Sequence, residues 1–328
     1  MKLIDSCNRI LNYLRISITD RCNLKCQYCS PRHLIPKLSH EEILSYEEIL
    51  HLVRIAVQLG ISKVRITGGE PLIRKGVHEF IQELHQVDGI CDISLTTNGV
   101  LLKDNVDALI AAGLHRINIS LDTLDPEKFM KITGVDAFDR VWEGIQKAYQ
   151  AGLSPIKINT VALRHFNDFE LEDIARLSFA YPFHFRFIEY MPIGMSEQEM
   201  SDSLYTPEIK QRLTDRIGEL IPVEHQITDG PAERFRFEGA PGEVGFISAM
   251  SHHFCHTCNR LRLTASGQLR SCLLSDHQED LKTPLRGGAS DEALSAIFLN
   301  AAKMKGVQHG LTADMPVRVS GQMSSIGG

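Results

Sequence analysis

The chain has 328 residues, and 43% of them are hydrophobic, which is enough for a sizeable core in one large domain or one domain with an extension. Its formal net charge of −6 argues against a general nucleic-acid-binding protein. No apolar run is long enough to span a bilayer and no signal peptide is evident, so we expect a cytoplasmic protein without a membrane partner. In that reducing compartment, the eight cysteines are expected to be ligands or redox groups.

Short β-branched runs alternate with amphipathic helical patterns as far as Tyr190. Strands are expected at 13–18, 63–67, 90–96, 116–120, 156–161 and 184–190. Helices are expected at 45–59, 76–85, 103–112, 138–151 and 168–179. Repeated strand–helix units predict parallel strands joined by right-handed crossovers. Six such units favour an α/β fold, an incomplete (β/α)6 TIM-like barrel, over a Rossmann sheet.

After Tyr190 the repeat loosens. A helix is expected at 206–220, followed by a stretch at 221–247 that is rich in Pro and Gly. We therefore predict a barrel over residues 1–194 and a C-terminal α+β extension over residues 195–328, which covers the open side of the barrel.

Three cysteines, Cys22, Cys26 and Cys29, lie within eight residues directly after the first predicted strand. Three thiolates can hold three irons of a four-iron cluster and leave the fourth iron open for chemistry. A structural zinc or a purely electron-transferring cluster would use four ligands. The spacing favours the open cluster, and a zinc loop that recruits His33 is the alternative.

A second set of three, Cys255, Cys258 and Cys272, lies in the extension. It too lacks a fourth cysteine, so a second open cluster is one interpretation and half of a zinc ribbon is the other. The zinc alternative would recruit one of the nearby histidines, which are His252, His253 and His256. Cys7 and Cys91 lie outside both sets and are expected to be ordinary buried thiols.

Basic side chains alternate into the predicted strands, so that several of them face the barrel interior. They are Arg15, Arg65, Lys157 and Arg186 in the barrel, and Arg260 and Arg262 after Cys258. Burying a charge without a partner is costly, so several such charges around one cavity imply a polyanionic ligand. Phosphate fits, because a guanidinium binds two of its oxygens at once.

The Cys-x3-Cys-x2-Cys loop, with an aromatic residue before its last cysteine, resembles the signature of the radical S-adenosylmethionine superfamily, and Gly68-Gly69-Glu70-Pro71 matches it too. The segments 12–17, 63–72, 187–191 and 254–264 resemble the GTP 3′,8-cyclase family more closely. With the second cysteine set and the terminal Gly327-Gly328, this resemblance covers nearly the whole chain.

The resemblance implies a lyase that converts GTP to (8S)-3′,8-cyclo-7,8-dihydroguanosine 5′-triphosphate, an early step of molybdenum cofactor biosynthesis. It implies two [4Fe-4S] clusters and S-adenosylmethionine as cofactors. It also implies a low-potential electron donor and a downstream cyclic pyranopterin monophosphate synthase as partners. No nucleic acid or membrane partner is expected, and the protein would be a monomer or a homodimer.

The resemblance also assigns roles to residues. The ligands of the first cluster would be Cys22, Cys26 and Cys29, and those of the second Cys255, Cys258 and Cys272. S-adenosylmethionine would contact Tyr28, Gly69, Ser120 and Met191. GTP would contact Arg15, Lys63, Arg65, Thr96, Lys157 and Arg186, together with Arg260, Leu261 and Arg262. Catalytic roles would fall to Arg260, Arg262, Gly327 and Gly328. The resemblance implies that the C-terminal tail enters its own barrel. The other interpretation is that the tail is a disordered end.

Two other functions remain open from the sequence. One is a radical enzyme with an auxiliary cluster that acts on a peptide, which would not need so many inward-facing basic residues. The other is a non-enzymatic zinc or iron–sulfur protein.

Overall fold

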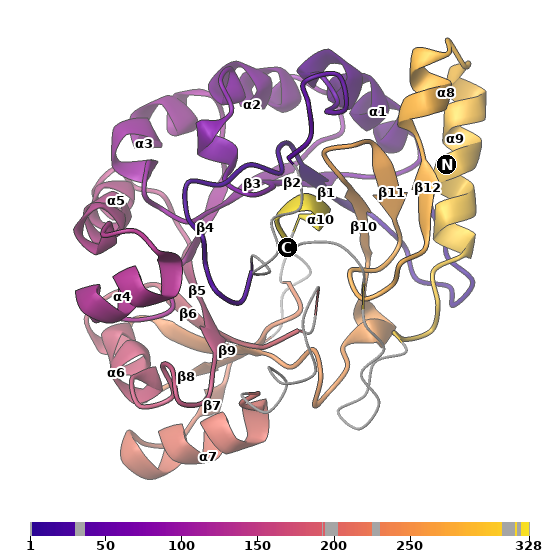
Figure 1. The fold of residues 1–328 in the computed structure, drawn as a ribbon. Coiled ribbons are helices and arrows are strands. Elements are labelled where there is room, and N and C mark those ends of the chain that lie inside the picture. Colours follow the sequence, from indigo (N-terminus) through magenta and orange to yellow (C-terminus); the bar gives the residue numbers. More distant parts are fainter. Residues whose placement is uncertain are drawn as a thin grey trace.

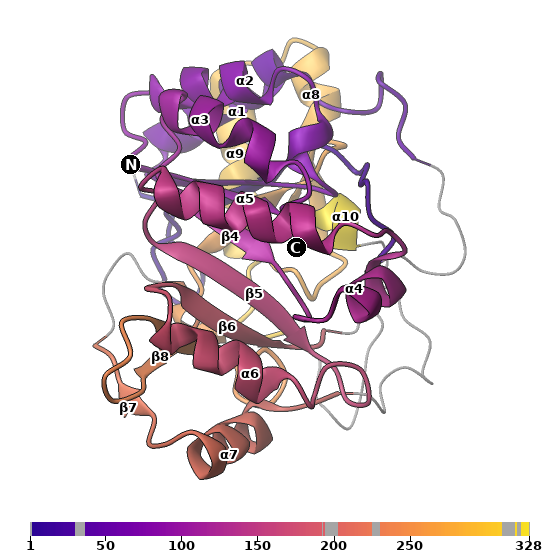
Figure 2. The same cartoon turned by 90° about the vertical axis from the view of Figure 1, so that its left-hand side faces the viewer.

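A twelve-stranded sheet curves into an incomplete ring, and helices lie along its outer side (Figures 1 and 2). The computed structural model describes residues 2–29, 37–191, 193, 203–224, 230–309, 319 and 323–327. The strand order is β12-β11-β10-β1-β2-β3-β4-β5-β6-β9-β8-β7. No helix in these described ranges is long and apolar enough to cross a membrane.

The six predicted barrel strands are present and pair in parallel, in chain order. They are β1 (Tyr13–Ser17), β2 (Lys63–Thr67), β3 (Asp92–Thr97), β4 (Arg116–Ser120), β5 (Ile156–Ala162) and β6 (His184–Glu189). Each boundary lies within two residues of the predicted one. The incomplete (β/α) barrel is thus confirmed.

The predicted helices also form on the outer side of the sheet. They are α1 (Tyr46–Gln58), α2 (Val77–His85), α3 (Leu102–Ala111), α5 (Phe138–Gln150) and α6 (Leu171–Arg176), which continues into the 3-10 turn η2 (Leu177–Phe179). Helix α4 (Pro126–Thr133) was not predicted, although its start signal is present in the sequence. The Asp125 carboxylate accepts hydrogen bonds from the first-turn backbone N–H groups, and Pro126 occupies the first helical position.

The C-terminal extension adds strands to both edges of the barrel sheet. These strands are β7 (Ile221–Pro222), β8 (Glu233–Arg236) and β9 (Glu243–Ile247) at one edge, and β10 (Arg260–Leu263), β11 (Gln268–Arg270) and β12 (Gln278–Asp280) at the other. Strand β9 pairs in parallel with β6, and β10 pairs in parallel with β1. The extension therefore flanks the open side of the barrel from both edges (Figure 1). The division at residue 194 stays a prediction.

The helices of the extension complete the fold: α7 (Thr206–Arg216), α8 (Lys282–Arg286), α9 (Asp291–Lys303) and α10 (Met323–Ile326). Short 3-10 turns, η1 (Pro71–Ile73) and η4 (Cys255–Thr257), follow β2 and precede β10. Helix α10 lies within the ring, near its centre in Figure 1, and the other three lie outside it.

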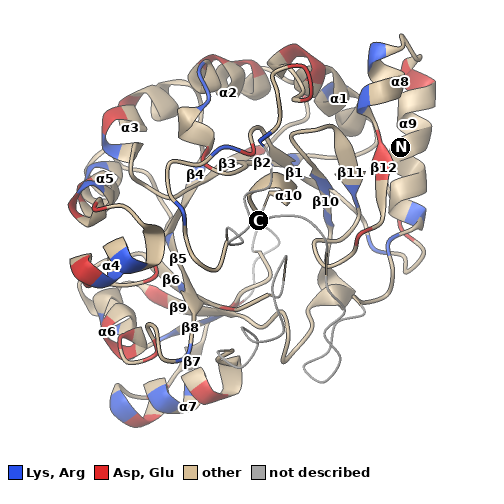
Figure 3. Ribbon diagram, in the orientation of Figure 1, with Lys and Arg blue, Asp and Glu red and all other residues tan. Residues whose placement is uncertain are grey.

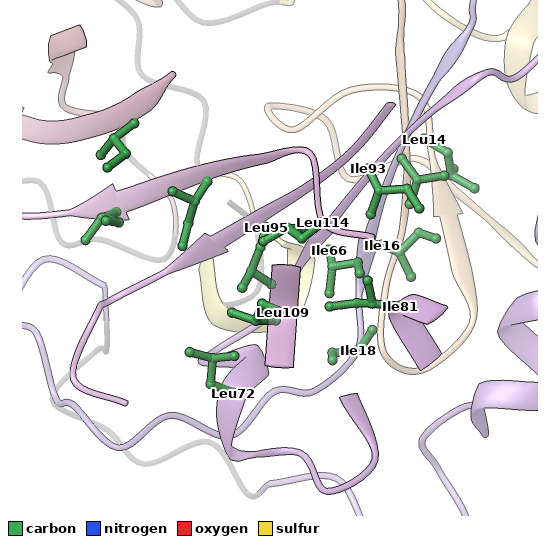
Figure 4. Close-up of a cluster of buried hydrophobic side chains, with 14 of the residues drawn as sticks. Leu14, Ile16, Ile18, Ile66, Leu72, Ile81, Ile93, Leu95, Leu109 and Leu114 are labelled. Atoms are coloured by element: carbon green, nitrogen blue, oxygen red, sulfur yellow. The ribbon is translucent and has the colours of Figure 1, made fainter. Parts of the chain in front are cut away.

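Alternation along the strands separates an outer apolar face from an inner polar face. Leu14 and Ile16 on β1 are fully buried and pack toward the helices with Ile66 on β2 (Figure 4). Their neighbour Arg15 points the other way, because successive side chains on a strand face opposite sides. Burial of each outer-face aliphatic side chain contributes about 1.5–3 kcal/mol to stability. The outer face therefore fixes the register of the strands, and this register determines which side chains point into the barrel.

Candidate active site

One cavity of about 290 Å³ lies inside the barrel, and all six cysteines of the two predicted sets line it. All eight cysteines of the chain are free thiols. The first set follows β1, and the second lies on the segments that precede β10 and follow β11. Two three-thiol sets that are far apart in the sequence therefore face one cavity.

The first cysteine loop rests directly on the Gly68-Gly69 turn after β2. The Gly69 N–H donates to Thr19 O at 2.8 Å. A Cβ on Gly69 would lie 2.1 Å from Arg21 O, and one on Gly68 would lie 2.4 Å from Thr19 O. The missing side chains of the two glycines therefore make room for the backbone of the cysteine loop. Gly69 also lines the cavity.

Glu70 is fully buried and ties this turn to the end of β3. Its carboxylate accepts hydrogen bonds from Leu72 N (3.0 Å), Thr97 Oγ1 (2.8 Å) and Asn98 N (2.7 Å). Burial raises the pKa of Glu70 to about 7, although these hydrogen bonds act to lower it. The Asn98 amide in turn donates to Asn23 Oδ1 in the cysteine loop at 2.8 Å. Glu70 thus positions the loop rather than lining the cavity.

Tyr28 and Asp122 connect the same loop to the ends of β4 and β5. The Tyr28 hydroxyl donates to Asp122 Oδ2 at 2.6 Å, and Asp122 Oδ1 accepts from Val161 N at 2.9 Å. Both Tyr28 and Asp122 line the cavity. Burial raises the pKa of Asp122 to about 6. It also raises the pKa of the Cys29 thiol to about 11, so this thiol ionises at neutral pH only when a cation compensates its charge.

The second cysteine set has a more basic environment. Burial raises the pKa of Cys258, but Arg260 and Lys305 outweigh it and bring the pKa down to about 5. Cys258 is therefore a thiolate at neutral pH. The residues present fit a thiolate-ligated cluster, because an iron–sulfur cubane takes thiolate ligands.

The zinc alternative gains no support from the geometry. In the described part of the chain, no three His, Cys, Asp or Glu side chains are arranged to hold a metal ion. A zinc site needs its ligands to converge on one point, whereas the irons of a cubane occupy separate corners. His253 Nδ1 donates a hydrogen bond to Ala249 O, 3.0 Å away. His33 lies outside the described residues.

A row of arginines crosses three neighbouring strands on the inner face. In the strand register, Arg15 on β1 lies between Arg262 on β10 and Arg65 on β2. Burial, and then the charges of Arg262 and Arg65, lower the pKa of Arg15 well below its usual value. Burial and Arg260 lower the pKa of Arg262 to about 9. The Nε atom of Arg15 is buried and has no hydrogen-bond partner among the described residues. This row is suited to an anion.

The other predicted contact residues are placed in three ways. The cavity lining includes Thr96, Arg186, Arg260, Ser120 and Met191. Lys63 and Lys157 are buried but do not line the cavity. Both lie on the inner face of the sheet, because Lys63 is two residues before Arg65 on β2 and Lys157 is two residues before Asn159 on β5. The side chain of Leu261 lies in the core instead, because it alternates with Arg260 and Arg262. Leu261 therefore has no side-chain contact to offer a cavity ligand.

The C-terminal tail enters the barrel. Met323 and Ser324 of α10 line the cavity, and Arg262 Nη1 donates to Gly327 O at 2.9 Å. A Cβ on Gly327, which has a φ of +81°, would lie 2.8 Å from Thr67 Cγ2. Gly328 lies outside the described residues.

Two residues that line the cavity, Tyr13 and Asn159, were not predicted to face it. Strand alternation predicts the orientation of both residues, because each lies two positions from a basic residue that is predicted to face inward, Arg15 for Tyr13 and Lys157 for Asn159. The interpretation of Cys91 as a buried thiol is wrong, since its side chain is exposed. Cys7 is half-buried.

Two family models match the chain. The Radical SAM superfamily matches residues 16–178, and Molybdenum Cofactor Synthesis C matches residues 183–311. A protein of Thermodesulfovibrio yellowstonii named GTP 3′,8-cyclase is 50% identical over 326 residues, which are 99% of each chain. Proteins with the same name from Moorella thermoacetica and Pelotomaculum thermopropionicum are 49% and 47% identical, also over 99% of each chain.

Among solved structures, Streptococcus suis SuiB bound to S-adenosylmethionine superposes with a TM-score of 0.61. The match covers 89% of this chain and 69% of SuiB at 16% identity, so it shows a shared fold.

Substitution Gly69→Ala is expected to displace the first cysteine loop, because the new Cβ would collide with the Arg21 carbonyl. Overpacking of this kind costs roughly 1–3 kcal/mol. Iron content after anaerobic reconstitution should fall. The control is Gly287→Ala, in which the nearest atom to the new Cβ is Thr283 O at 3.2 Å, so this variant should take up iron as wild type does. Equal iron content in the two variants would contradict the loop contact.

Proposed function

Because the chain belongs to the GTP 3′,8-cyclase family of the radical S-adenosylmethionine superfamily, we propose that its cavity is where GTP is cyclised between ribose C3′ and guanine C8. The observation that carries this proposal is the shared cavity: both three-thiol sets and the arginine row line it together. The product, (8S)-3′,8-cyclo-7,8-dihydroguanosine 5′-triphosphate, enters molybdenum cofactor biosynthesis.

Each cysteine set would hold one [4Fe-4S] cluster. The first, on Cys22, Cys26 and Cys29, would bind S-adenosylmethionine at its open iron and supply a 5′-deoxyadenosyl radical when the cofactor is bound. Gly69, Ser120 and Met191 lie on the cavity wall where they can contact that cofactor. Tyr28 would face it with its hydroxyl already oriented by Asp122.

The arginine row would bind the triphosphate of GTP. Arg15, Arg65 and Arg262 lie side by side in the register, so one polyanion can neutralise all three. Thr96 and Arg186 line the same cavity, and Lys63 and Lys157 would add positive charge deeper on the same face. With the triphosphate held there, the guanine can reach the second cluster on Cys255, Cys258 and Cys272 while the ribose stays near the first.

The tail would complete the site. Arg262 Nη1 already holds the Gly327 carbonyl, so the glycine end and the arginine row share one contact. By accepting this hydrogen bond, the Gly327 carbonyl would orient the Arg262 guanidinium. Arg260 lies two residues before Arg262 on the same strand, β10. We assign Arg260, Arg262 and Gly327 to the catalytic step on this basis, and the family resemblance extends the assignment to Gly328.

The wider setting follows from the same chemistry. Cleavage of a sulfonium by one electron needs a low-potential donor, and the cyclic product would pass to a cyclic pyranopterin monophosphate synthase. A cytoplasmic location suits oxygen-sensitive clusters and free thiols. The protein would act as a monomer or a homodimer. A peptide substrate is disfavoured, because the three relatives described above, which match over 99% of the chain, are each named for GTP.

Loss of one cluster should separate two activities. Cys26→Ala is expected to abolish S-adenosylmethionine cleavage, whereas Cys258→Ala should keep some cleavage and lose GTP conversion. Each reaction is measured anaerobically by its nucleoside product. Wild-type protein should bind about eight irons, four per cubane. Binding of about four irons would contradict the two-cluster assignment.

Arg260→Ala is expected to weaken GTP binding and to spare S-adenosylmethionine binding. Loss of one charge-assisted hydrogen bond costs roughly 1.5–3 kcal/mol, which is about a tenfold to hundredfold rise in the dissociation constant. Titration of each ligand into cluster-loaded protein measures both constants. Equal weakening of the two ligands would refute the assigned role.

Deletion of Gly327 and Gly328 should leave both clusters loaded and abolish most GTP conversion, because Arg262 loses the carbonyl that orients it. Iron content serves as the control for folding. Wild-type turnover by the truncated protein would show that the tail has no catalytic role.

A further inference from the structure

Two cations lie behind the second cysteine set, on the side away from the cavity. Lys305 follows helix α9, and Arg9 belongs to a turn near the N-terminus. Neither lines the cavity, so neither is placed to contact substrate. Lys305 is nevertheless only 3% exposed, which is unusual for a lysine.

The Lys305 ammonium joins two of the three cysteine segments. Its Nζ donates to Arg260 O at 3.0 Å and to Ser271 O at 2.5 Å. Arg260 lies two residues after Cys258, and Ser271 lies directly before Cys272. One buried side chain therefore fixes the distance between two predicted ligands.

Arg9 holds the third segment. Its Nη1 donates to Cys255 O at 2.5 Å, and its Nη2 donates to Gly306 O at 2.6 Å, directly after Lys305. The buried Asp5 carboxylate orients the guanidinium through Nε at 2.5 Å. The N-terminal turn, the end of α9 and the three cysteine segments thus form one connected network.

The charge of Lys305 needs a counter-charge, because burying an ammonium among carbonyl groups alone is costly. Among the described residues, the charged groups that shift the pKa of Lys305 most are Cys258, Cys272 and Arg260, and none of them is a carboxylate. Burial lowers the pKa of Lys305, the thiols of Cys258 and Cys272 act in the opposite direction and favour the charged ammonium, and Arg260 opposes it. The thiolates that would ligate the cluster are therefore its electrostatic partners.

We propose that Lys305, assisted by Arg9, is a positioning residue of the second cluster whose buried charge also favours the reduced form of that cluster. This proposal rests on the two-cluster function above. Uptake of one electron makes the cluster and its three thiolates one unit more negative. A fixed positive charge behind them stabilises that state and raises the reduction potential.

The test compares Lys305→Met with wild type and with Lys303→Met, which removes an exposed lysine two residues away. All are reconstituted anaerobically as the full chain and titrated with dithionite while electron paramagnetic resonance is recorded. The signal that changes with GTP but not with S-adenosylmethionine reports the second cluster. Its midpoint potential and the iron content are the readouts.

We expect Lys305→Met to lower that midpoint potential or to lose about half of the iron while retaining S-adenosylmethionine cleavage. Lys305→Arg should restore the midpoint potential and the iron content, and Lys303→Met should match wild type in both readouts. Two loaded clusters with an unchanged midpoint in Lys305→Met would overturn the proposal. If Lys305→Met does not fold, Arg9→Met is judged by the same two criteria. Absence of a GTP-sensitive signal in wild type would instead refute the proposed function.

Discussion

Buried positive charge is the constraint on which this site depends. The strand register places Arg262, Arg15 and Arg65 in one row, and each of them is aimed inward by the apolar residues that alternate with it. Burial, and then repulsion by the neighbouring arginines, lowers the pKa of the central Arg15. Burial of the barrel core offsets the cost of this repulsion, and a bound polyanion would neutralise the three positive charges. The row would therefore favour a triphosphate substrate by electrostatics. Figure 3 shows where Lys and Arg lie along the ribbon.

The two ends of the cavity are built by different means. At the first cysteine set, backbone contacts between Gly69 and the loop, and the buried carboxylates of Glu70 and Asp122, fix the position of the thiols. At the second set, the cations Arg9 and Lys305 hold the cysteine segments through their carbonyls. Burial raises the pKa of Cys29 in the first set and of Cys255 in the second, whereas Arg260 and Lys305 lower the pKa of Cys258 to about 5. These different surroundings suit one cluster that activates a cofactor and another that binds substrate.

Most of the barrel could be predicted because its strands carry a simple period-two pattern and its helices a period of three to four. Strands β8 and β9 were missed because the stretch that contains them is rich in Gly and Pro, and β9 is defined by its pairing with β6 rather than by local composition. Strand alternation predicts that Arg15 faces inward, and by the same rule the side chain of Leu261 faces the core, contrary to its expected contact with GTP. The roles of Glu70 and Lys305 depend on contacts across long sequence separations, and no local pattern reveals these.

The central claim is that the two cysteine sets act on one GTP molecule held between them. The most direct measurement uses GTP deuterated at C3′, incubated anaerobically with the cluster-loaded protein, S-adenosylmethionine and a reductant. The account predicts that 5′-deoxyadenosine gains one deuterium as a cyclised nucleotide forms, both detected by mass spectrometry. Unlabelled 5′-deoxyadenosine, or labelled 5′-deoxyadenosine without any cyclised nucleotide, would contradict it.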